Sequence, residues 1–246
     1  MDLGLDGRTA LVMGASSGLG LATAEALREE GANVVMFARR EELLREHADR
    51  LQATAVPGDV FRREDLENAV ESAVNAHGGL DILVLNGGGP PPGPASHVSE
   101  EAIERAVELL LRPVVTMTEA ALPHLRRSGQ GRIISISSVS VIEPIPGLAL
   151  SNAVRPGVWG YLKTLSVEVA RDGVTVNAVA PGRIATARMA ELYGGEPPQS
   201  EAAAIPVGRF GEPRELGDVV CFLASKRASY VNGAMVRIDG GLSKSL

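Results

Sequence analysis

The fold of this 246-residue chain is decided by the stretch Thr9-Ala10-Leu11-Val12-Met13-Gly14-Ala15-Ser16-Ser17-Gly18-Leu19-Gly20. Its first five residues are the short, mainly apolar run of a buried strand, and the residues after Gly20 repeat apolar side chains at helical spacing. Glycines at such a junction allow a sharp turn and leave amide groups open to phosphate at a helix N-terminus. We therefore predict that Gly14, Ser16, Ser17, Gly18, Leu19 and Gly20 bind a dinucleotide. The alternative is a tight turn that serves only helix packing, and the strand-turn-helix setting favours phosphate binding.

The same alternation of strand and helix continues to the end of the chain. An apolar run over residues 33–38 completes the first β-α-β unit. Further strands are predicted over residues 54–56, 81–85, 133–136, 174–179 and 235–238, and helices over 64–76, 100–127, 151–170 and 215–224. This order predicts a single-domain α/β Rossmann fold, a doubly wound, mostly parallel sheet with helices on both faces. Residues 183–206 are small, polar and proline-containing, which favours a mobile lid over a second domain.

Composition excludes several classes of function. The formal net charge of −6 provides no overall positive field for nucleic acid or an anionic membrane. We see neither a secretory signal at the start nor an apolar run of roughly 18 residues, and the single cysteine, Cys221, lies in an apolar run and cannot form an internal disulfide. We expect a soluble cytoplasmic protein. The four histidines lack metal-ligand spacing, so we expect no metal site, and no nucleophile elbow supports hydrolase chemistry.

The end of the second strand bears on the choice of dinucleotide. A site for NAD is expected to have an acid there, but this chain has Arg39 and Arg40. Because a guanidinium pairs well with a 2′-phosphate, the sequence favours NADP, with NAD as the alternative cofactor. The competing interpretation is that both arginines are solvated charges that open the next helix.

Several spaced motifs together resemble the short-chain dehydrogenase/reductase family over essentially the whole chain, and most of all its 3-oxoacyl carrier-protein reductase branch. The glycine loop matches the family pattern, and Tyr230-Val231-Asn232-Gly233 and Asp239-Gly240-Gly241 resemble a C-terminal motif near which members often pair subunits. The resemblance thus implies a homo-oligomer, either a dimer or a tetramer. It also implies that the cofactor contacts include Asp59, Val60, Asn86, Gly87, Gly88, Pro181, Gly182, Ile184 and Thr186.

The catalytic positions depart from the family pattern. Ser138 matches the family's catalytic serine, but the Tyr-x-x-x-Lys motif expected thirteen residues later reads Ser151 and Arg155. Leu110 stands where the family usually has an asparagine that orders a relay water. A serine is a far weaker acid than tyrosine, and losing general acid catalysis typically costs about 10² to 10⁴ in rate. We expect Ser138, Ser151 and Arg155 to be the catalytic residues, with Arg155 also bonding the nicotinamide ribose.

Two functions follow from these residues. The leading one is an NADP-dependent oxidoreductase of a small-molecule carbonyl or alcohol substrate, in which Ser151, Arg155 or an ordered water completes a modified proton relay. The alternative is a catalytically impaired, dinucleotide-binding homologue that serves as a sensor or partner subunit. A homologue that binds no dinucleotide is a third, less favoured class. Tyr161, Tyr193 and His97 are considered as substitute proton donors, and each fits better as an ordinary structural or surface residue.

Overall fold

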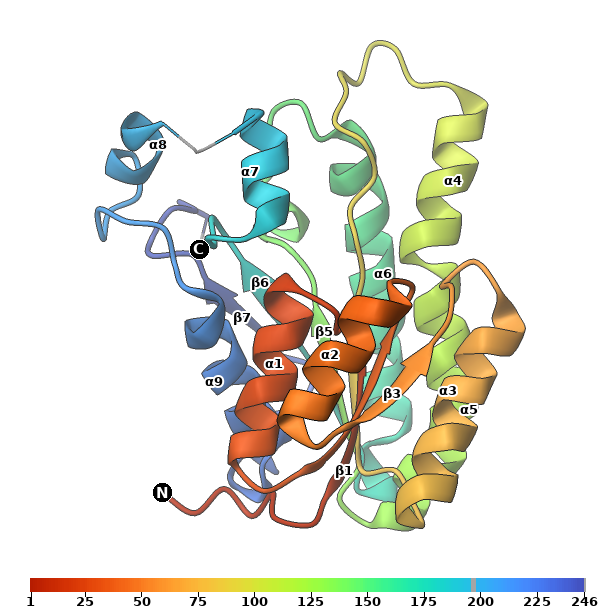
Figure 1. Ribbon diagram of the computed structural model, residues 1–246. Helices are drawn as coiled ribbons and strands as arrows, with labels where there is room; N and C mark the ends of the chain where they lie inside the picture. Colours follow the sequence, from red (N-terminus) through yellow and green to blue (C-terminus); the bar gives the residue numbers. More distant parts are fainter. Residues whose placement is uncertain (196–197, 246) are drawn as a thin grey trace.

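The computed structural model describes residues 1–195 and 198–245. The strands of this part form one sheet with the order β3-β2-β1-β4-β5-β6-β7, and every neighbouring pair is parallel (Figure 1). The predicted α/β Rossmann fold is therefore confirmed. The strands are β1 (Thr9–Met13), β2 (Asn33–Ala38), β3 (Thr54–Pro57), β4 (Ile82–Asn86), β5 (Arg132–Ile136), β6 (Thr175–Pro181) and β7 (Met235–Ile238).

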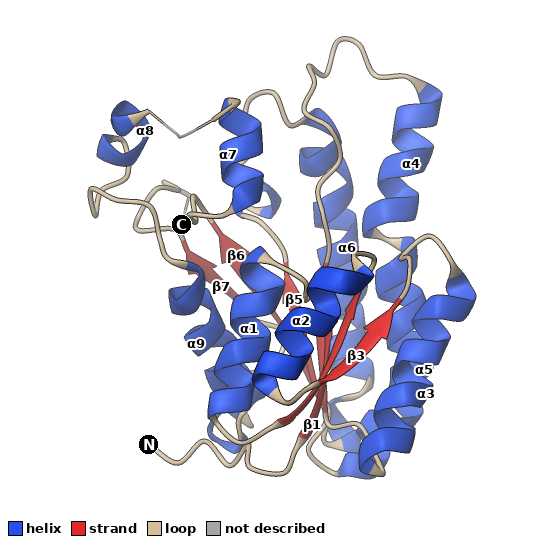
Figure 2. Ribbon diagram, in the orientation of Figure 1, coloured by secondary structure: helices blue, strands red, loops and turns tan. Residues whose placement is uncertain are grey.

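Helices cover both faces of the sheet because the side chains of each buried strand alternate between two apolar cores (Figure 2). Leu11 and Met13 pack on one face, and Ala10 and Val12 pack on the other. The first face is covered by α3 (Arg63–His77), α4 (Glu100–Leu110), α5 (Arg112–Ser128) and α6 (Ala149–Glu168). The second face is covered by α1 (Gly18–Glu29), α2 (Glu41–Leu51) and α9 (Pro213–Ala224). Single turns of 3-10 helix lie at Val139–Val141, Ala170–Asp172 and Lys226–Ala228.

The centre of the sheet is the point at which the winding of the chain reverses. Strand β1 pairs with β2 on one side and with β4 on the other, so Leu11 lies between Val35 and Leu83. In open parallel sheets, ligands bind beyond the carboxyl ends of the strands at such a switch point. The glycine loop follows β1 directly, so the fold places it at this position.

One predicted helix differs from the structure. The single helix expected over residues 100–127 is two helices that meet at Leu111. Pro113 in the first turn of α5 lacks an amide hydrogen and its ring crowds the preceding turn, which favours a break here, although Pro123 and Pro156 lie inside α5 and α6. Residues 183–206, where a mobile lid is expected, contain α7 (Ala187–Tyr193) and α8 (Gln199–Ala203), which lie beyond the carboxyl edge of the sheet in Figure 1, and the mobility of the segment stays a prediction. Residues 196 and 197 of that segment lie outside the described residues.

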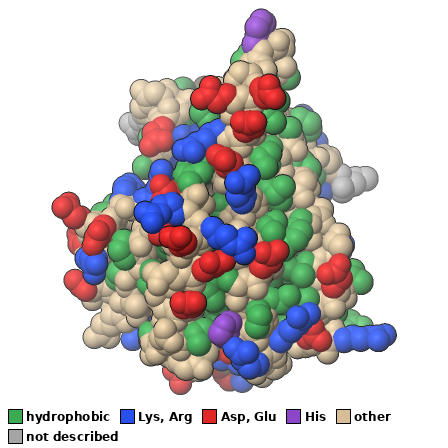
Figure 3. All heavy atoms as spheres, turned by 90° about the vertical axis from the view of Figure 1, so that its right-hand side faces the viewer, with side chains coloured by type: hydrophobic (Ala, Val, Ile, Leu, Met, Phe, Trp, Pro, Cys, Tyr) green, Lys and Arg blue, Asp and Glu red, His purple; other side chains and the backbone are tan. Residues whose placement is uncertain are grey.

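The surface carries both charges intermingled. Over the face formed by α3, α4 and α5, acidic and basic side chains alternate in Figure 3. Arg63 pairs with Glu67 there, and Arg105 and Arg112 both lie near Glu108. The lone cysteine, Cys221, is buried in the core around α9, as its apolar neighbours predict. No helix in the described part of the chain is long and apolar enough to cross a membrane.

Candidate functional site

The glycine loop presents free amide groups at the start of α1. Gly14 and Gly18 have left-handed backbone angles, with φ of 67° and 56°, which favour glycine. Ser17 precedes the helix in extended conformation, and its side chain does not cap it. No described residue accepts a hydrogen bond from the amides of Ser17, Gly18 or Leu19. Free amides at a helix N-terminus are suited to an anion.

Close packing behind the loop holds these amides in place. A Cβ atom on Gly20 would lie 2.2 Å from the carbonyl oxygen of Gly14 and 2.7 Å from Nδ2 of Asn86. The Asn86 amide donates a hydrogen bond to the same Gly14 carbonyl at 3.4 Å. Asn86, expected as a cofactor contact, therefore also supports the loop from the end of β4.

Arg40 brings positive charge to the edge of the loop. Its Nη2 atom donates to Oγ of Ser16 at 3.2 Å and also to Oγ of Ser17. Arg39 and Arg40 are both exposed, and among the described residues only Arg40 has a hydrogen bond to the loop. A guanidinium beside two loop hydroxyls fits the 2′-phosphate of NADP, whereas a carboxylate at this position would fit the ribose of NAD. The structure thus brings Arg40, but not Arg39, to the predicted phosphate loop.

The Asp59 carboxylate lies in the turn after β3. Its Oδ1 atom accepts a hydrogen bond from the amide of Phe61 at 3.1 Å, and Val60 packs against the core beside it. This contact orders the turn that follows β3. A contact with adenine at this position stays a prediction.

Ser151 and Arg155 form one hydrogen-bonded unit on α6. The Nε atom of Arg155 donates to Oγ of Ser151 at 3.1 Å, as their spacing of one helical turn allows. The same guanidinium donates through Nη2 to the Gly88 carbonyl at 3.2 Å and through Nη1 to the Ser137 carbonyl at 3.5 Å. Arg155 therefore joins α6 to the ends of β4 and β5, which are the elements that carry the other predicted site residues.

A chain of hydroxyl groups extends from this unit. Ser140, which the sequence analysis missed, places its Oγ atom 3.3 Å from Oγ of the buried Ser151. The amide of Ser140 donates to Oγ of Ser138 at 3.1 Å, so the Ser138 hydroxyl keeps its own hydrogen for donation. Ser138, Ser140 and Ser151 are thus gathered beside Arg155. The only signal for Ser140 in the sequence was its position two residues after Ser138.

A second arginine, Arg188, also lies near Arg155 and was not predicted. It comes from α7, donates through Nη2 to the Pro90 carbonyl at 3.3 Å, and forms an ion pair through Nη1 with Glu191 at 3.2 Å. Burial, together with the positive charge of Arg188, lowers the pKa of Arg155 to about 10. Arg155 still carries its charge at neutral pH, and this part of the site is electropositive.

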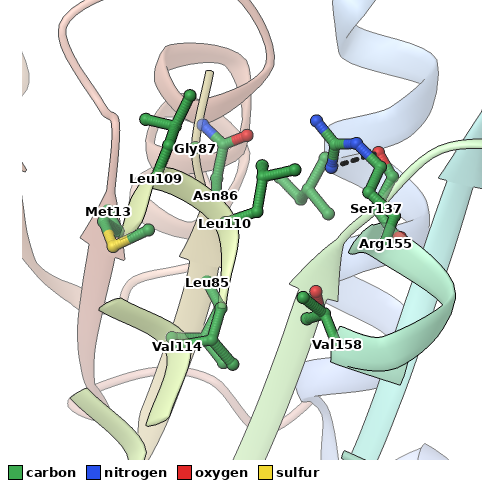
Figure 4. A pocket seen from close by; sticks show the side chains of 12 residues that line it. Met13, Leu85, Asn86, Gly87, Leu109, Leu110, Val114, Ser137, Arg155 and Val158 are labelled. Carbon is green, nitrogen blue, oxygen red and sulfur yellow. Dashed lines mark hydrogen bonds between the residues drawn. The ribbon is translucent and has the colours of Figure 1, made fainter. Parts of the chain in front are cut away.

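A small cavity of about 20 Å³ lies between Arg155 and α4 (Figure 4). Its walls include the polar groups of Asn86 and Ser137 and the apolar side chains of Leu109 and Leu110. This volume is enough for one water molecule. Leu110 is almost fully buried and offers such a water no hydrogen bond, so Arg155, Asn86 and Ser137 provide the polar partners.

The predicted contacts after β6 divide into two kinds. Thr186 caps α7 by accepting from the Met189 amide, and its methyl group would lie 3.7 Å from a Cβ atom on Gly18, so it adjoins the glycine loop. The side chain of Ile184 is buried, which leaves only its backbone to face a ligand. Pro181 ends β6 inside the core, and the Gly182 amide donates to the Ile238 carbonyl at 3.0 Å.

None of the three substitute proton donors has a hydrogen bond to Ser138, Ser151 or Arg155 among the described residues. Tyr193 donates to Glu201 at 2.7 Å, and its pKa is raised by partial burial and by that hydrogen bond. The pKa of Tyr161 is also raised, mainly by burial and further by the negative charge of the nearby Glu119. His97 is exposed and contacts its neighbour Ser96. Within the described ranges, no three His, Cys, Asp or Glu side chains gather as metal ligands.

Comparisons with known proteins find relatives over almost the whole chain. Residues 14–243 match the family model described as enoyl-(acyl carrier protein) reductase. A 3-oxoacyl-[acyl-carrier-protein] reductase from Vibrio cholerae is 36% identical over 98% of this chain and 99% of its own length. Human dehydrogenase/reductase SDR family member 4 is 32% identical over 98% of this chain and 90% of its own length.

Solved structures include relatives with bound dinucleotide. L-sorbose reductase from Gluconobacter frateurii, complexed with NADPH and L-sorbose, superposes with a TM-score of 0.94 at 33% identity, covering 100% of both chains. An NADPH-bound short chain oxidoreductase from Pseudomonas aeruginosa, described as containing an atypical catalytic center, has a TM-score of 0.91 at 30% identity and covers 96% of this chain and 97% of its own.

Proposed function

Because this chain belongs to the short-chain dehydrogenase/reductase family, we propose that it is an NADP-dependent oxidoreductase of a small-molecule carbonyl or alcohol. The observation that carries the proposal is the open amide row at Ser17, Gly18 and Leu19 with the Arg40 guanidinium beside it. The amides suit the pyrophosphate and the guanidinium suits the 2′-phosphate. The NADPH bound to the sorbose reductase and to the Pseudomonas oxidoreductase supports the same cofactor here.

Further residues would hold the rest of the cofactor. We assign the adenine side to Asp59 and Val60, and the ribose and nicotinamide side to the Asn86 to Gly88 turn, Arg155 and the segment from Pro181 to Thr186. The bound nicotinamide would supply or accept the hydride. The assigned residues end or follow β3, β4 and β6 or, like Arg155, reach the ends of β4 and β5, so they lie on both sides of the switch point between β1 and β4, across which a dinucleotide is expected to bind.

The protein's part in the reaction is electrostatic. As hydride reaches a substrate carbonyl, negative charge develops on its oxygen, and the Ser138 hydroxyl would donate a hydrogen bond to it. The Arg155 guanidinium stabilises this charge but stays protonated near neutral pH, so it does not deliver the proton itself. The Ser151 hydroxyl would give its proton to the substrate oxygen and take another from the Ser140 hydroxyl, which a proton from solvent would then restore.

Two finer features belong to the same proposal. The 3-oxoacyl reductase relatives make a 3-oxoacyl thioester the first substrate class to test. We also propose a homo-oligomer, a dimer or tetramer, in which the fully exposed Tyr230 near the C-terminal motif becomes covered. Light scattering of the purified protein during gel filtration measures the mass, and a monomer throughout the micromolar range would contradict this part of the proposal.

The deciding experiment combines binding with turnover. Calorimetry is expected to give NADPH binding, and loss of NADPH absorbance with a panel of ketones and 3-oxoacyl thioesters is expected to show slow reduction that Ser138→Ala removes. The double variant Ser151→Tyr/Arg155→Lys, which restores a stronger acid and the family's cation, should increase that rate. NADPH binding without turnover in the wild-type protein would contradict the oxidoreductase.

One observation favours a second function, a dinucleotide-binding sensor or partner subunit without hydride chemistry. The positions of the general acid and of the relay asparagine are occupied by Ser151 and Leu110, while the phosphate loop is intact. Activity that appears only in the Ser151→Tyr/Arg155→Lys variant would support this second function. It would also show that the pocket still admits a substrate.

A further inference from the structure

We propose that Arg155 and Arg188 form a carboxylate-binding subsite over Gly89, so that the substrate of the proposed reaction is a carboxylic acid that also bears the reacting carbonyl or alcohol. The inference rests on the proposed function, because it names the substrate class of that same site. It depends on two arginines that reach one point from different helices and on the glycine that leaves that point open.

The geometry is that of a two-sided clamp. A Cβ atom on Gly89 would lie 3.8 Å from Nη2 of Arg155 and 3.8 Å from Nη2 of Arg188. The two nitrogens are therefore at most twice that distance, 7.6 Å, apart. At that distance or less, one carboxylate can accept a charge-assisted hydrogen bond of about 2.8 Å from each nitrogen. Glycine at position 89 adds no side chain to the space between the guanidinia.

The charge at this point is only partly balanced by the protein. Arg155 donates to two carbonyl oxygens and one serine hydroxyl, which are neutral acceptors. Arg188 donates to the Pro90 carbonyl and has one carboxylate partner, Glu191. The three charged groups sum to a single positive charge, and Glu201, another acid among the described residues of this segment, is paired with Arg183. One positive charge matches a carboxylate monoanion better than a phosphate dianion.

Burial makes this positive charge unfavourable unless an anion pairs with it. Half-buried Arg155 has its pKa lowered by burial and by Arg188, so two like charges are held together in surroundings of reduced polarity. A bound anion removes that repulsion. The subsite adjoins the proposed reacting groups, because Nε of Arg155 contacts Ser151. We therefore expect the carboxylate and the reacting carbonyl of the substrate to be separated by only a few covalent bonds.

The test uses the full-length protein saturated with NADP⁺, in which a ketone cannot be reduced. Calorimetry measures binding of two matched pairs, 2-oxobutanoate with its methyl ester and 4-oxopentanoate with its methyl ester. We expect at least one acid to bind about tenfold or more tighter than its ester. Arg188→Gln should abolish that preference. Arg126→Gln, which removes an equal charge from an Asp172 ion pair at the far end of α5, should retain it.

The outcomes separate the two proposals. Failure of NADP⁺ to bind the wild-type protein would contradict the proposed function. Normal NADP⁺ binding with equal affinities for acid and ester, or with no measurable affinity for any of the four compounds, would overturn the subsite. A preference that persists in Arg188→Gln would overturn it too. NADP⁺ affinity serves as the folding check on each variant, and Arg188 lies on the partly exposed helix α7.

Discussion

Replacing Gly20 with alanine tests the physical basis of the cofactor site. The new Cβ atom would lie 2.2 Å from the Gly14 carbonyl oxygen, where ordinary contact begins at 3.4 Å, so the start of α1 must move by about 1.2 Å. A phosphate-amide hydrogen bond of about 2.9 Å lengthened by that amount is no longer a hydrogen bond. Losing two such bonds at about 1.5 kcal/mol each weakens NADPH binding by at least about 100-fold.

Stability should change much less than binding. Alanine gains about 1 kcal/mol over glycine in a helix, whereas overpacking costs about 1–3 kcal/mol. The net loss of up to about 2 kcal/mol lowers the melting temperature by only a few degrees in a chain of this size. Calorimetric titration with NADPH and thermal unfolding give both quantities. Gly79→Ala, whose Cβ would have no heavy atom within 4 Å, is the matched control. Wild-type NADPH affinity in Gly20→Ala would refute the reasoning.

Three further predictions concern single side chains. Arg40→Gln should raise the dissociation constant of NADPH about 10-fold or more and leave that of NADH unchanged. The control Arg39→Gln should change neither dissociation constant. Equal losses of NADPH affinity in the two variants would contradict the assignment of Arg40 to the 2′-phosphate. Burial lowers the pKa of Arg155 to about 10, so its positive charge persists below that pH. The preference for the acid over its ester should therefore be constant from pH 6 to 9 and fall as the pH rises through about 10. A preference that changes near neutral pH would show that another group is responsible. Burial raises the pKa of Cys221 to about 12, so the native thiol should react with Ellman's reagent far more slowly than the unfolded chain, and rapid reaction of native protein would show that this helix opens.

Regular elements were predictable from the sequence wherever burial on both faces forces a continuous apolar run. The run from Asn33 to Ala38, for example, forms a strand between β1 and β3, and its apolar side chains fill both cores. The predicted helix over residues 100–127 is divided at Leu111, next to Pro113, whereas Pro123 in the same range lies inside α5, so the position of a proline alone does not show where a helix ends. The helices α7 and α8 are short, with only 7 and 5 residues, so their periodicity is too weak to detect.

The candidate site divides in the same way. The glycine loop and the Ser151 and Arg155 pair are local patterns, in which sequence spacing fixes geometry over one turn of helix. Ser140 and Arg188 reach the site through tertiary packing, and Arg188 does so from a helix that follows an entire strand after Arg155. No spacing rule links such residues, so only the three-dimensional arrangement reveals the second cation.

The replacements at positions 151 and 155 are better understood as one change than as two losses. The Arg155 guanidinium bonds three acceptors on two strand ends and on its own helix, which a lysine with a single terminal nitrogen would not span in the same way. The small Ser151 side chain offers its hydroxyl within 3.1 Å of Nε, where a tyrosine hydroxyl would lie a full ring farther from the helix. Each residue therefore sets the position in which the other acts, and groups that share contacts in this way are not additive. The double variant Ser151→Tyr/Arg155→Lys is therefore the relevant comparison with the usual Tyr-Lys pair. Ser151→Tyr alone would leave a tyrosine beside an arginine, and Arg155→Lys alone would leave Ser151 without its hydrogen-bond partner.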